Sequence, residues 1–353
     1  MYAASMRFLP DNPIHISVVI PTWNRAELLV DAIRSVSERS VPITLIVVDD
    51  GSQDKTESVL SNLACDHSLH YIRVAHAGFP GRCRNIGVEA ATTAWVAFLD
   101  SDDRFCPDKL GRQMDELART GLSLCHTRER WLRDGSVVSQ SHMRHARRGD
   151  IFPDAVKKCI VGPSTTLMRR ELFQRFGGYR EDLEIAEDYE FLLRLLAFEK
   201  IAYVDDELIE KRAGLAPQLS EKYAQIEGFR IRALAGFVVD VAAARREGGQ
   251  GAAGGEHIHG GGEPRDGGAP RDGGGEPGAG GLDALVRVGR PPEPRWGSVD
   301  PASVPQDKLA LATRELARKC RVYARGAAKR GRDEEASWYR AAAREAEALH
   351  PHA

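Results

Sequence analysis

The chain has 353 residues, 42% of them hydrophobic, and a formal net charge of −2 from 49 basic and 51 acidic side chains. This size fits one large α/β domain with an appendage, and the near balance of charge gives no net electrostatic attraction to nucleic acid. No segment approaches the roughly 18 apolar residues of a membrane span, and residues 1–13 lack the basic start and apolar core of a secretion signal. We therefore expect a cytoplasmic protein, with peripheral association at the inner face of a membrane left open.

Strand and helix patterns alternate through the first hundred residues. Buried strands are predicted at 16–20, 43–48, 69–74 and 95–99. Helical spacing of apolar residues predicts helices at 26–38, from Ser52 or Asp54 to about residue 63, and at 81–91. This alternation predicts right-handed crossovers and a mostly parallel sheet that helices cover on both faces.

The patterns are weaker after the fourth strand. Pro107 occupies the favoured first position of a helix that runs to about residue 120. Further strands are predicted at 122–126 and 136–141, and further helices at 170–176 and 187–198. The six cysteines show no pair at metal-binding spacing, and we expect them to be reduced and mostly buried.

The composition changes abruptly near residue 247. Residues 247–281 are dense in Gly, Pro, Glu and Arg and cannot bury enough apolar surface to offset the entropy of ordering them. From residue 305 an Ala/Arg/Glu-rich segment, interrupted at Gly331, predicts a helical hairpin that docks on the α/β domain or on a second copy. The predicted parts are a flexible N-terminus, an α/β domain, a disordered linker and this hairpin, at residues 1–13, 14–246, 247–304 and 305–353.

Four polar clusters follow predicted strands or begin helices, and the carboxyl ends of parallel strands meet at one edge of a sheet. Arginines and helix amides suit a diphosphate, and a carboxylate after the second strand can accept from a base or ribose. Trp23 either stacks on a base or lies in the core. The clusters are Pro21-Thr22-Trp23-Asn24, Asp49-Asp50-Gly51-Ser52, Arg82-Cys83-Arg84-Asn85 and Asp100-Ser101-Asp102-Asp103.

The carboxylates of the fourth cluster, Asp100, Asp102 and Asp103, carry the strongest chemical signal. Unpaired carboxylates at the end of a buried strand repel one another and lose hydration, so a divalent cation such as Mg²⁺ or Mn²⁺, shared with a phosphate-bearing substrate, is the expected stabiliser. The alternative is a solvated acidic turn that caps the helix after Pro107.

These motifs, in this order, resemble the successive signatures of family-2 glycosyltransferases over residues 14–212. The resemblance implies the GT-A fold, a three-layer α/β/α fold with a mostly parallel central sheet, to which this chain adds the C-terminal hairpin. It does not extend to the Gly-rich segment or the hairpin. The motifs that carry it are Val18-Val19-Ile20-Pro21-Thr22-Trp23-Asn24, Val47-Val48-Asp49-Asp50-Gly51-Ser52, Arg84-Asn85-Ile86-Gly87, Phe98-Leu99-Asp100-Ser101-Asp102-Asp103, and the later block Gly177-Gly178-Tyr179 with Ala186-Glu187-Asp188-Tyr189.

The resemblance also implies a role for each matching residue. Asp50 would contact the base, usually uracil. Asp102 and Asp100 would coordinate the metal on the diphosphate, and Asp100 would also hold the ribose or the donor sugar. Asp188 would be the catalytic base and Glu187 its orienting partner, although the same pair also suits the first turn of a helix. The predicted donor-binding residues are Pro21, Thr22, Trp23, Asn24, Asp49, Asp50, Arg84, Asn85, Asp100 and Ser101.

The chain departs from the family pattern in ways that narrow the function. It lacks the Gln-x-x-Arg-Trp element and the transmembrane helices of polymerising members, which favours transfer of a single sugar. Arg180 stands where many relatives have Asp, and the arginines of residues 144–148 form a loop that could close over the diphosphate.

The predicted function is an inverting, metal-assisted transfer from a nucleotide-diphosphate sugar, a UDP-sugar above all, to a glycan, lipid-linked or small-molecule acceptor. Cell-envelope polysaccharide synthesis is the expected setting. The hairpin could also join two copies of the chain into a homo-oligomer. One alternative function is that of a catalytically silent protein of the same fold that acts as a binding scaffold. Another is a sugar nucleotidyltransferase, which would carry a Gly-rich loop where this chain has Pro21 to Asn24.

Overall fold

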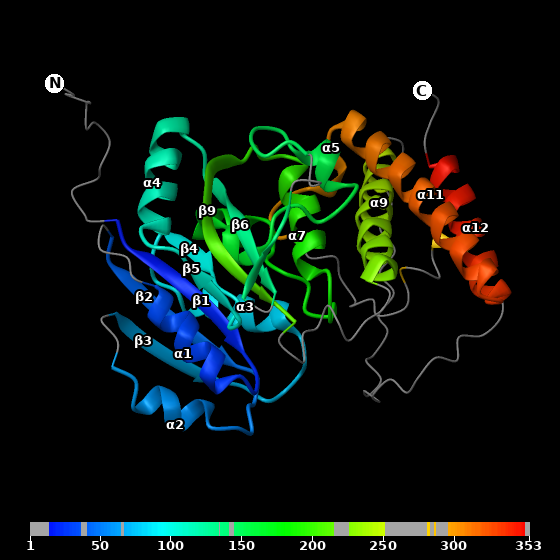
Figure 1. The fold of residues 1–353 in the computed structure, drawn as a ribbon. Helices are drawn as coiled ribbons and strands as arrows, with labels where there is room; N and C mark the ends of the chain where they lie inside the picture. The colour runs from blue at the N-terminus through cyan, green and yellow to red at the C-terminus, as the bar shows by residue number, and fades with distance from the viewer. Residues whose placement is uncertain are drawn as a thin grey trace, which may run out of the picture. The chain divides into compact units, whose positions relative to one another are not determined.

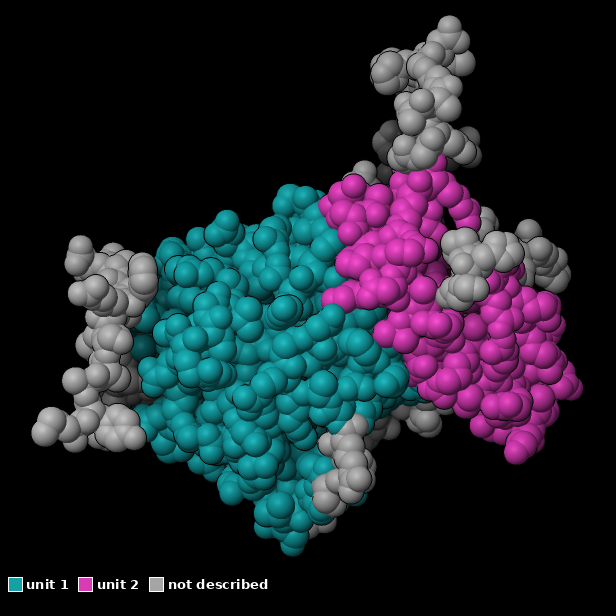
Figure 2. Space-filling model, turned by 90° about the horizontal axis from the view of Figure 1, so that it is seen from above, with its two compact units in different colours: residues 1–233, 291–299 teal, residues 234–290, 300–353 magenta. Residues whose placement is uncertain are grey.

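The computed structural model describes residues 14–36, 41–64, 67–133, 135–140, 145–214, 226–250, 281–282, 286 and 296–349. The chain divides into two compact units, one of residues 1–233 with 291–299 and one of residues 234–290 with 300–353, which Figure 2 colours separately. The predicted flexible N-terminus lies outside the described residues, as do residues 251–280 of the predicted linker.

The first unit is built on a sheet whose strands run in the order β3-β2-β1-β4-β8-β6-β9-β5, with β7 paired to β6 (Figure 1). β1 pairs in parallel with β2 and β4, and β2 pairs in parallel with β3, which confirms the four predicted strands and their direction. The strands are β1 Ile16–Thr22, β2 Ile43–Asp49, β3 Ser68–Arg73, β4 Trp95–Phe98, β5 Asp103–Phe105, β6 Leu124–Arg133, β7 Ser136–Val138, β8 Leu167–Arg169 and β9 Ala202–Ala213.

Helices cover both faces of this sheet. Alternate strand residues such as Val18 and Ala97 pack with apolar residues of α1, α2 and α4. The opposite face carries α3, α6 and α7, where the Phe98 ring lies 5.7 Å from that of Phe173. The predicted three-layer arrangement is confirmed. The helices are α1 Ala26–Ser35, α2 Thr56–Ser61, α3 Pro80–Ala90, α4 Lys109–Thr120, α5 Phe152–Ala155, α6 Arg170–Arg175 and α7 Glu187–Leu196, with the 3₁₀ turn η1 Pro163–Thr165.

A glycine lets α3 lie directly on the sheet. A Cβ atom at Gly87 would come within 2.3 Å of Val19 Cγ1, a distance that no side chain can accommodate without displacing the helix. Because α3 carries Arg84 one turn earlier, this close approach also holds Arg84 over the carboxyl end of the sheet.

Strand β9 was not predicted, and β6 is longer than the predicted strand at 122–126. Both carry charged residues along half of their length, which hides the apolar alternation that marks a strand. The two strands pair in parallel, and their charges meet across the pair, as where Arg130 Nη2 donates to Glu210 Oε2 at 2.8 Å. Lys211 and Arg212 lie near the end of β9.

The second unit is helical. Helix α9, Ile226–Gln250, crosses the boundary between the units, so residues 247–250 of the predicted linker are helical. The short 3₁₀ turn η2, Pro301–Ser303, leads to α11, Gln306–Lys329, and α12, Asp333–Ala348. The predicted hairpin is confirmed, with Gly331 at φ +71° between its helices and the Tyr323 and Tyr339 rings 4.3 Å apart.

The C-terminal end of the predicted linker also has described structure. Ser298 N donates to Arg175 O at 3.0 Å within the first unit, and Trp296 is buried. No helix in the described ranges combines the length and apolar composition needed to cross a membrane.

Candidate active site

The loops after β1 and β2 are tied together by side chains. Asn24 N donates to Ser52 Oγ at 2.8 Å, and Asn24 Oδ1 accepts from Gln53 N at 2.7 Å. Asp54 Oδ2 accepts from Ala26 N at 3.0 Å and so caps the start of α1. The predicted clusters after the first two strands therefore form one continuous rim.

The two carboxylates after β2 are held by this chain's own groups. Buried Asp49 accepts from the Tyr71 hydroxyl at 2.6 Å. Asp50, also buried, accepts from Ala77 N at 3.0 Å and from Gly78 N at 2.8 Å. Asp50 thus holds the loop after β3 against the rim, in addition to the base-binding role predicted for it.

Trp23 lies on the surface of this rim rather than in the core, so the core alternative is wrong. Its side chain is 44% exposed, and its ring stacks on His76 with centroids 4.4 Å apart and planes 13° from parallel. His76 Nδ1 lies 2.9 Å from Asp50 Oδ2. Trp23, His76 and Asp50 therefore form one contiguous cluster of side chains at the loop after β3.

Arg84 joins the donor-side and acceptor-side motifs. Its Nη2 donates to Asp100 Oδ1 at 2.6 Å and its Nη1 donates to Glu187 Oε1 at 2.6 Å, although Arg84 and Glu187 are 103 residues apart. Burial raises the pKa of Glu187 to about 7, against the opposing effect of Arg84. Burial would also raise the pKa of Asp100, but Arg84 and other nearby cations outweigh it and lower that pKa. One buried guanidinium therefore bridges two carboxylates by two charge-assisted hydrogen bonds.

The other carboxylates after β4 also have cationic neighbours. Asp102 Oδ2 accepts from Arg25 Nη1 at 2.6 Å, and Asp103 Oδ2 lies 3.8 Å from Lys211 Nζ and accepts from Ser164 Oγ at 2.6 Å. Burial raises the pKa of Asp103 to about 8, despite Lys211. Cationic side chains of the chain itself therefore offset part of the predicted repulsion, although the charges of Asp100 and Asp102 still help burial to raise the pKa of Asp103.

Asp188 lies in the first turn of α7, as the helix alternative predicted, and faces the same site. Its Oδ1 accepts from Tyr189 N at 2.7 Å, and its Oδ2 lies 3.4 Å from Cys159 Sγ, which donates to it. Burial and the Asp188 charge raise the pKa of Cys159 well above its usual range. Against the effect of burial, the charges of Asp103, Glu129 and Asp100, and to a smaller extent that of Asp188, raise the pKa of Lys211. The two readings of the Glu187-Asp188 pair are therefore compatible.

The side-chain amide of Asn85, which was predicted to bind the sugar donor, is hydrogen-bonded within the protein. Its Nδ2 donates to Tyr179 O at 2.8 Å and to Glu181 Oε1 at 2.9 Å, and its Oδ1 accepts from Tyr179 N at 2.9 Å. These bonds occupy the amide and hold residues 179–181 against α3. We infer that Asn85 positions this loop rather than binding the donor.

The remaining predicted donor residues line the ends of β1 and β4. Pro21 is half-buried in β1, opposite Val48 of β2. Thr22 is buried, and its Oγ1 has no hydrogen-bond partner. Ser101 is buried between Asp100 and Asp102.

Sequence reasoning missed four side chains at this site. Arg25 directly follows the Pro-Thr-Trp-Asn motif, so its position was a signal that went unused. Ser164 and Lys211 belong to η1 and β9, which were not predicted, and Cys159 was treated only as a buried thiol. All four reach the site through long-range packing.

The described residues contain no group of three or more His, Cys, Asp or Glu side chains that could hold a metal ion by themselves. Mg²⁺ in phosphate-binding sites is commonly held by one or two carboxylates, with substrate phosphates and water as the other ligands. Asp102 and Asp100 fit that smaller donor set. A cation here would therefore need the diphosphate as a further ligand.

The arginine loop lies at the opposite edge of the sheet. The guanidinium carbons of Arg147 and Arg148 lie 5.6 and 5.9 Å from the Tyr203 ring centroid. Tyr203 is near the start of β9, whereas Lys211 is near its end. The prediction that these two arginines close over the diphosphate is wrong, because their loop packs on the amino end of the sheet. Arg144 lies outside the described residues.

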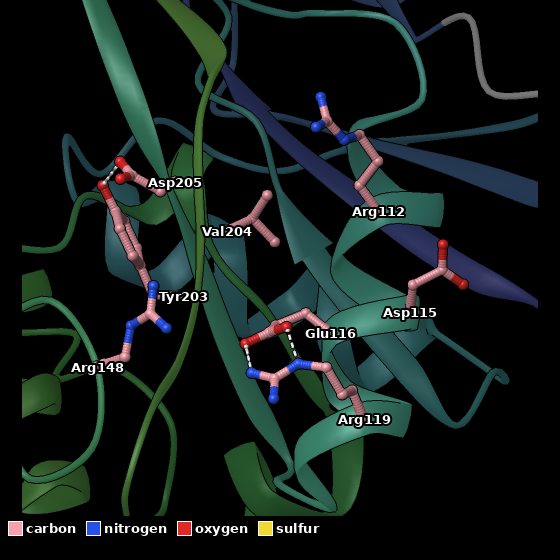
Figure 3. Close-up of a pocket in the computed structure, with 8 residues that line it drawn as sticks. All are labelled: Arg112, Asp115, Glu116, Arg119, Arg148, Tyr203, Val204 and Asp205. Carbon is pink, nitrogen blue, oxygen red and sulfur yellow. Dashed lines mark hydrogen bonds and ion pairs between the residues drawn. The ribbon is translucent and has the colours of Figure 1, made fainter.

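An open depression of about 560 Å³ occupies this amino edge (Figure 3). Figure 3 shows two interactions in its lining, the ion pair of Glu116 with Arg119 and the hydrogen bond that the Tyr203 hydroxyl donates to Asp205. The predicted site residues lie elsewhere. The depression is lined by Arg112, Asp115, Glu116, Arg119, Arg148, Tyr203, Val204 and Asp205.

Comparison with known proteins agrees with this geometry. Residues 17–177 match the family model for glycosyl transferase family 2. An uncharacterized glycosyltransferase of Rickettsia conorii is 27% identical over 202 residues, which cover 57% of this chain and 33% of the relative. The putative teichuronic acid biosynthesis glycosyltransferase TuaG of Bacillus subtilis is 30% identical over 159 residues, which cover 44% of this chain and 62% of the relative. The chain thus spans only part of the length of these relatives.

Among solved structures, S. aureus TarS 1–349 in complex with UDP-GlcNAc superposes with a TM-score of 0.57 at 16% identity, covering 94% of this chain and 92% of that chain. At this identity the similarity concerns the fold, which is the GT-A fold. The family-model match covers residues 17–177, and over these residues the chain is similar to glycosyltransferase family 2.

Proposed function

We propose that this chain is an inverting glycosyltransferase that moves a single sugar from a UDP-sugar to a hydroxyl of a glycan, lipid-linked or small-molecule acceptor. The observation that carries the proposal is the Arg84 bridge. It joins Asp100, in the motif assigned to the donor, to Glu187, beside the proposed base, at 2.6 Å each. Donor and acceptor chemistry would then meet at one buried centre.

The comparisons support the nature of the donor and the setting. The TarS structure is described as a complex with UDP-GlcNAc, and the names of TuaG and of the Rhizobium meliloti succinoglycan biosynthesis protein ExoO place those proteins in polysaccharide synthesis. We propose by extension that this chain uses a UDP-sugar as its donor and acts in the synthesis of a cell-envelope polysaccharide. The proposed donor residues are Pro21, Thr22, Trp23, Asn24, Asp49, Asp50, Arg84, Asp100 and Ser101.

The donor side of the site suits a diphosphate leaving group. Asp102 and Asp100 would hold a divalent cation together with the diphosphate, and the bound cation would offset the charge that grows on the leaving group. The Trp23 ring, exposed on one edge of the rim, is available to stack on the base. Lys211 contributes a buried positive charge at the same end of the sheet.

The acceptor side suits a single base. The Asp188 carboxylate would take the proton from the acceptor hydroxyl as that oxygen attacks the anomeric carbon opposite the leaving diphosphate. The Tyr189 amide and the Cys159 thiol hold the two Asp188 oxygens in place. Glu187, bonded to Arg84, keeps the start of α7 beside the donor motif.

A thermal-shift screen of nucleotide sugars with Mg²⁺ or Mn²⁺ tests the donor assignment, because a ligand that binds only the folded state raises the melting temperature. With the donor identified, Asp188→Asn should slow transfer by about 10³-fold while the donor still raises the melting temperature. Asp206→Asn, at the exposed amino edge, is the control and should leave both unchanged. Undiminished transfer by Asp188→Asn would remove the base assignment, and the absence of any stabilising nucleotide sugar would favour the scaffold alternative.

A further inference from the structure

Helix α11 of the second unit carries a concentration of positive charge that the proposed reaction does not use. From position 314 to position 329 it has six basic residues and one acidic residue, within a chain whose net charge is −2. The acidic residue, Glu315, is buried, and both of its oxygens accept from Arg318. Every exposed charged residue of this stretch is therefore basic.

Five of the basic residues lie on one side of the helix, and we call them the basic stripe. At 100° per residue they fall within an arc of about 80°, and at 1.5 Å per residue they span about 22 Å along the axis. The opposite side of α11 carries small and apolar residues that are buried, such as Leu316 and Cys320. The basic stripe consists of Arg314, Arg318, Arg321, Arg325 and Lys329, all exposed.

Two of the five cations in the basic stripe have acidic partners. Arg321 pairs with Glu347 of α12, and Arg318 pairs with Glu315. Val322 lies next to this arc and is 48% exposed. A cluster of about four to eight Lys or Arg residues on one side of a helix is a sequence feature of binding to anionic lipid headgroups.

We propose that the basic stripe docks the second unit on an anionic lipid bilayer. A straight helix presents all five cations to a plane at once, whereas a curved polyanion meets fewer of them. Val322 adds an apolar contact that headgroups can accommodate and that a sugar-phosphate backbone cannot use. Each basic residue near such a surface strengthens binding about fivefold. The inference is independent of the proposed transfer reaction, since no residue of the first unit enters it.

The test is flotation of the full chain with phosphatidylcholine vesicles that do or do not contain phosphatidylglycerol. The wild type should float with the anionic vesicles only, and added salt should release it. The double variant Arg325→Gln/Lys329→Gln should bind about 25-fold more weakly, which is two factors of about five. Neither residue belongs to an ion pair that anchors α11 to a neighbour among the described contacts.

A matched control removes the same charge from the same unit. Arg340 and Arg344 are exposed on α12, and Arg340→Gln/Arg344→Gln should bind the anionic vesicles as the wild type does. Melting temperatures of both variants show that each remains folded. Three results overturn the proposal: no flotation of the wild type, equal loss in both variants, or tighter binding to single-stranded RNA or heparin than to the vesicles at the same salt.

Discussion

The two edges of the sheet in the first unit both carry ion pairs between arginines and carboxylates, but the pairs differ in their exposure to solvent. At the carboxyl edge, Arg84 is 5% exposed and is shared between Asp100 and Glu187. At the amino edge, Arg112 and Asp206 form an ion pair whose side chains are both nearly half exposed. The open depression lies at the amino edge, yet the shared and buried charges lie at the other.

We infer that the burial of charge, more than the size of a hollow, marks the edge of the sheet that carries the proposed active site. A charge removed from water is costly unless it is paired, so a protein that buries several of them in one place retains them for a purpose other than simple stability. Exposed pairs such as Arg112 with Asp206 are screened and contribute little. Four changes test this contrast.

Arg84→Gln should have the largest effect. It leaves the buried Glu187 and the half-buried Asp100 without their shared cation, which should lower the free energy of unfolding by about 3–5 kcal/mol. Arg84→Lys should recover little of this, because one ammonium group cannot reproduce the two-pronged contact of the guanidinium. Urea unfolding followed by circular dichroism measures both values. A loss below about 1 kcal/mol would show that the bridge is no stronger than a surface pair.

His126 should make the stability depend on pH. Burial lowers the pKa of His126 to about 4, and its ring nitrogen lies 2.6 Å from Arg147 O in the amino-edge loop. Between pH 6.5, the usual histidine pKa, and pH 4 the unfolded chain therefore binds a proton that the native chain does not. Stability should fall as the pH drops through this range, by about 3 kcal/mol from this residue.

The control for this prediction is His126→Gln, which cannot titrate. Its free energy of unfolding should be lower than that of the wild type at pH 7 but should decline less between pH 7 and pH 4.5, since the remaining decline comes from the carboxylates. Urea titrations at the two pH values give the difference. Equal declines in the two proteins would contradict the assignment.

Arg25 should oppose metal binding in the absence of donor. Its guanidinium contacts Asp102, so a divalent cation that uses the same carboxylate must displace it or share the oxygen. Arg25→Gln should tighten Mn²⁺ binding by about five- to tenfold, the equivalent of about 1 kcal/mol for a partly exposed pair. Calorimetric titration of Mn²⁺ into the donor-free protein measures this. Arg34→Gln, an exposed cation in the last turn of the same helix, should not change the affinity, and equal affinities for all three proteins would remove Arg25 from this role.

Arg112→Gln should have the smallest effect. Its pair with Asp206 is exposed on both sides, so the loss should be at most about 1 kcal/mol in the free energy of unfolding. The melting-temperature increase caused by a nucleotide sugar should also be unchanged. A loss comparable with that of Arg84→Gln would mean that the two edges do not differ as described.

The parts of the site that could be predicted are those written in short stretches of sequence. A buried strand followed at once by Asp100, Asp102 and Asp103 can be recognised without any partner, and the same holds for the Glu187-Asp188 pair at the start of a helix. The surface position of Trp23 could not be predicted, because an aromatic residue after a strand is equally suited to a core. Its exposure depends on how the loop after β3 places His76.

The sequence by itself determined the alternation of strands and helices, and with it the edge of the sheet where the polar clusters gather, since apolar periodicity and strand direction are local properties. The tertiary structure alone decided which charge meets which. Arg84 reaches Glu187 across 103 residues, and Lys211 reaches Asp103 from β9, a strand whose charged residues conceal its pattern. Such pairs form between residues that are far apart in the sequence and that packing brings together. A buried charge without a partner is costly, so it is paired with whichever group the fold places beside it.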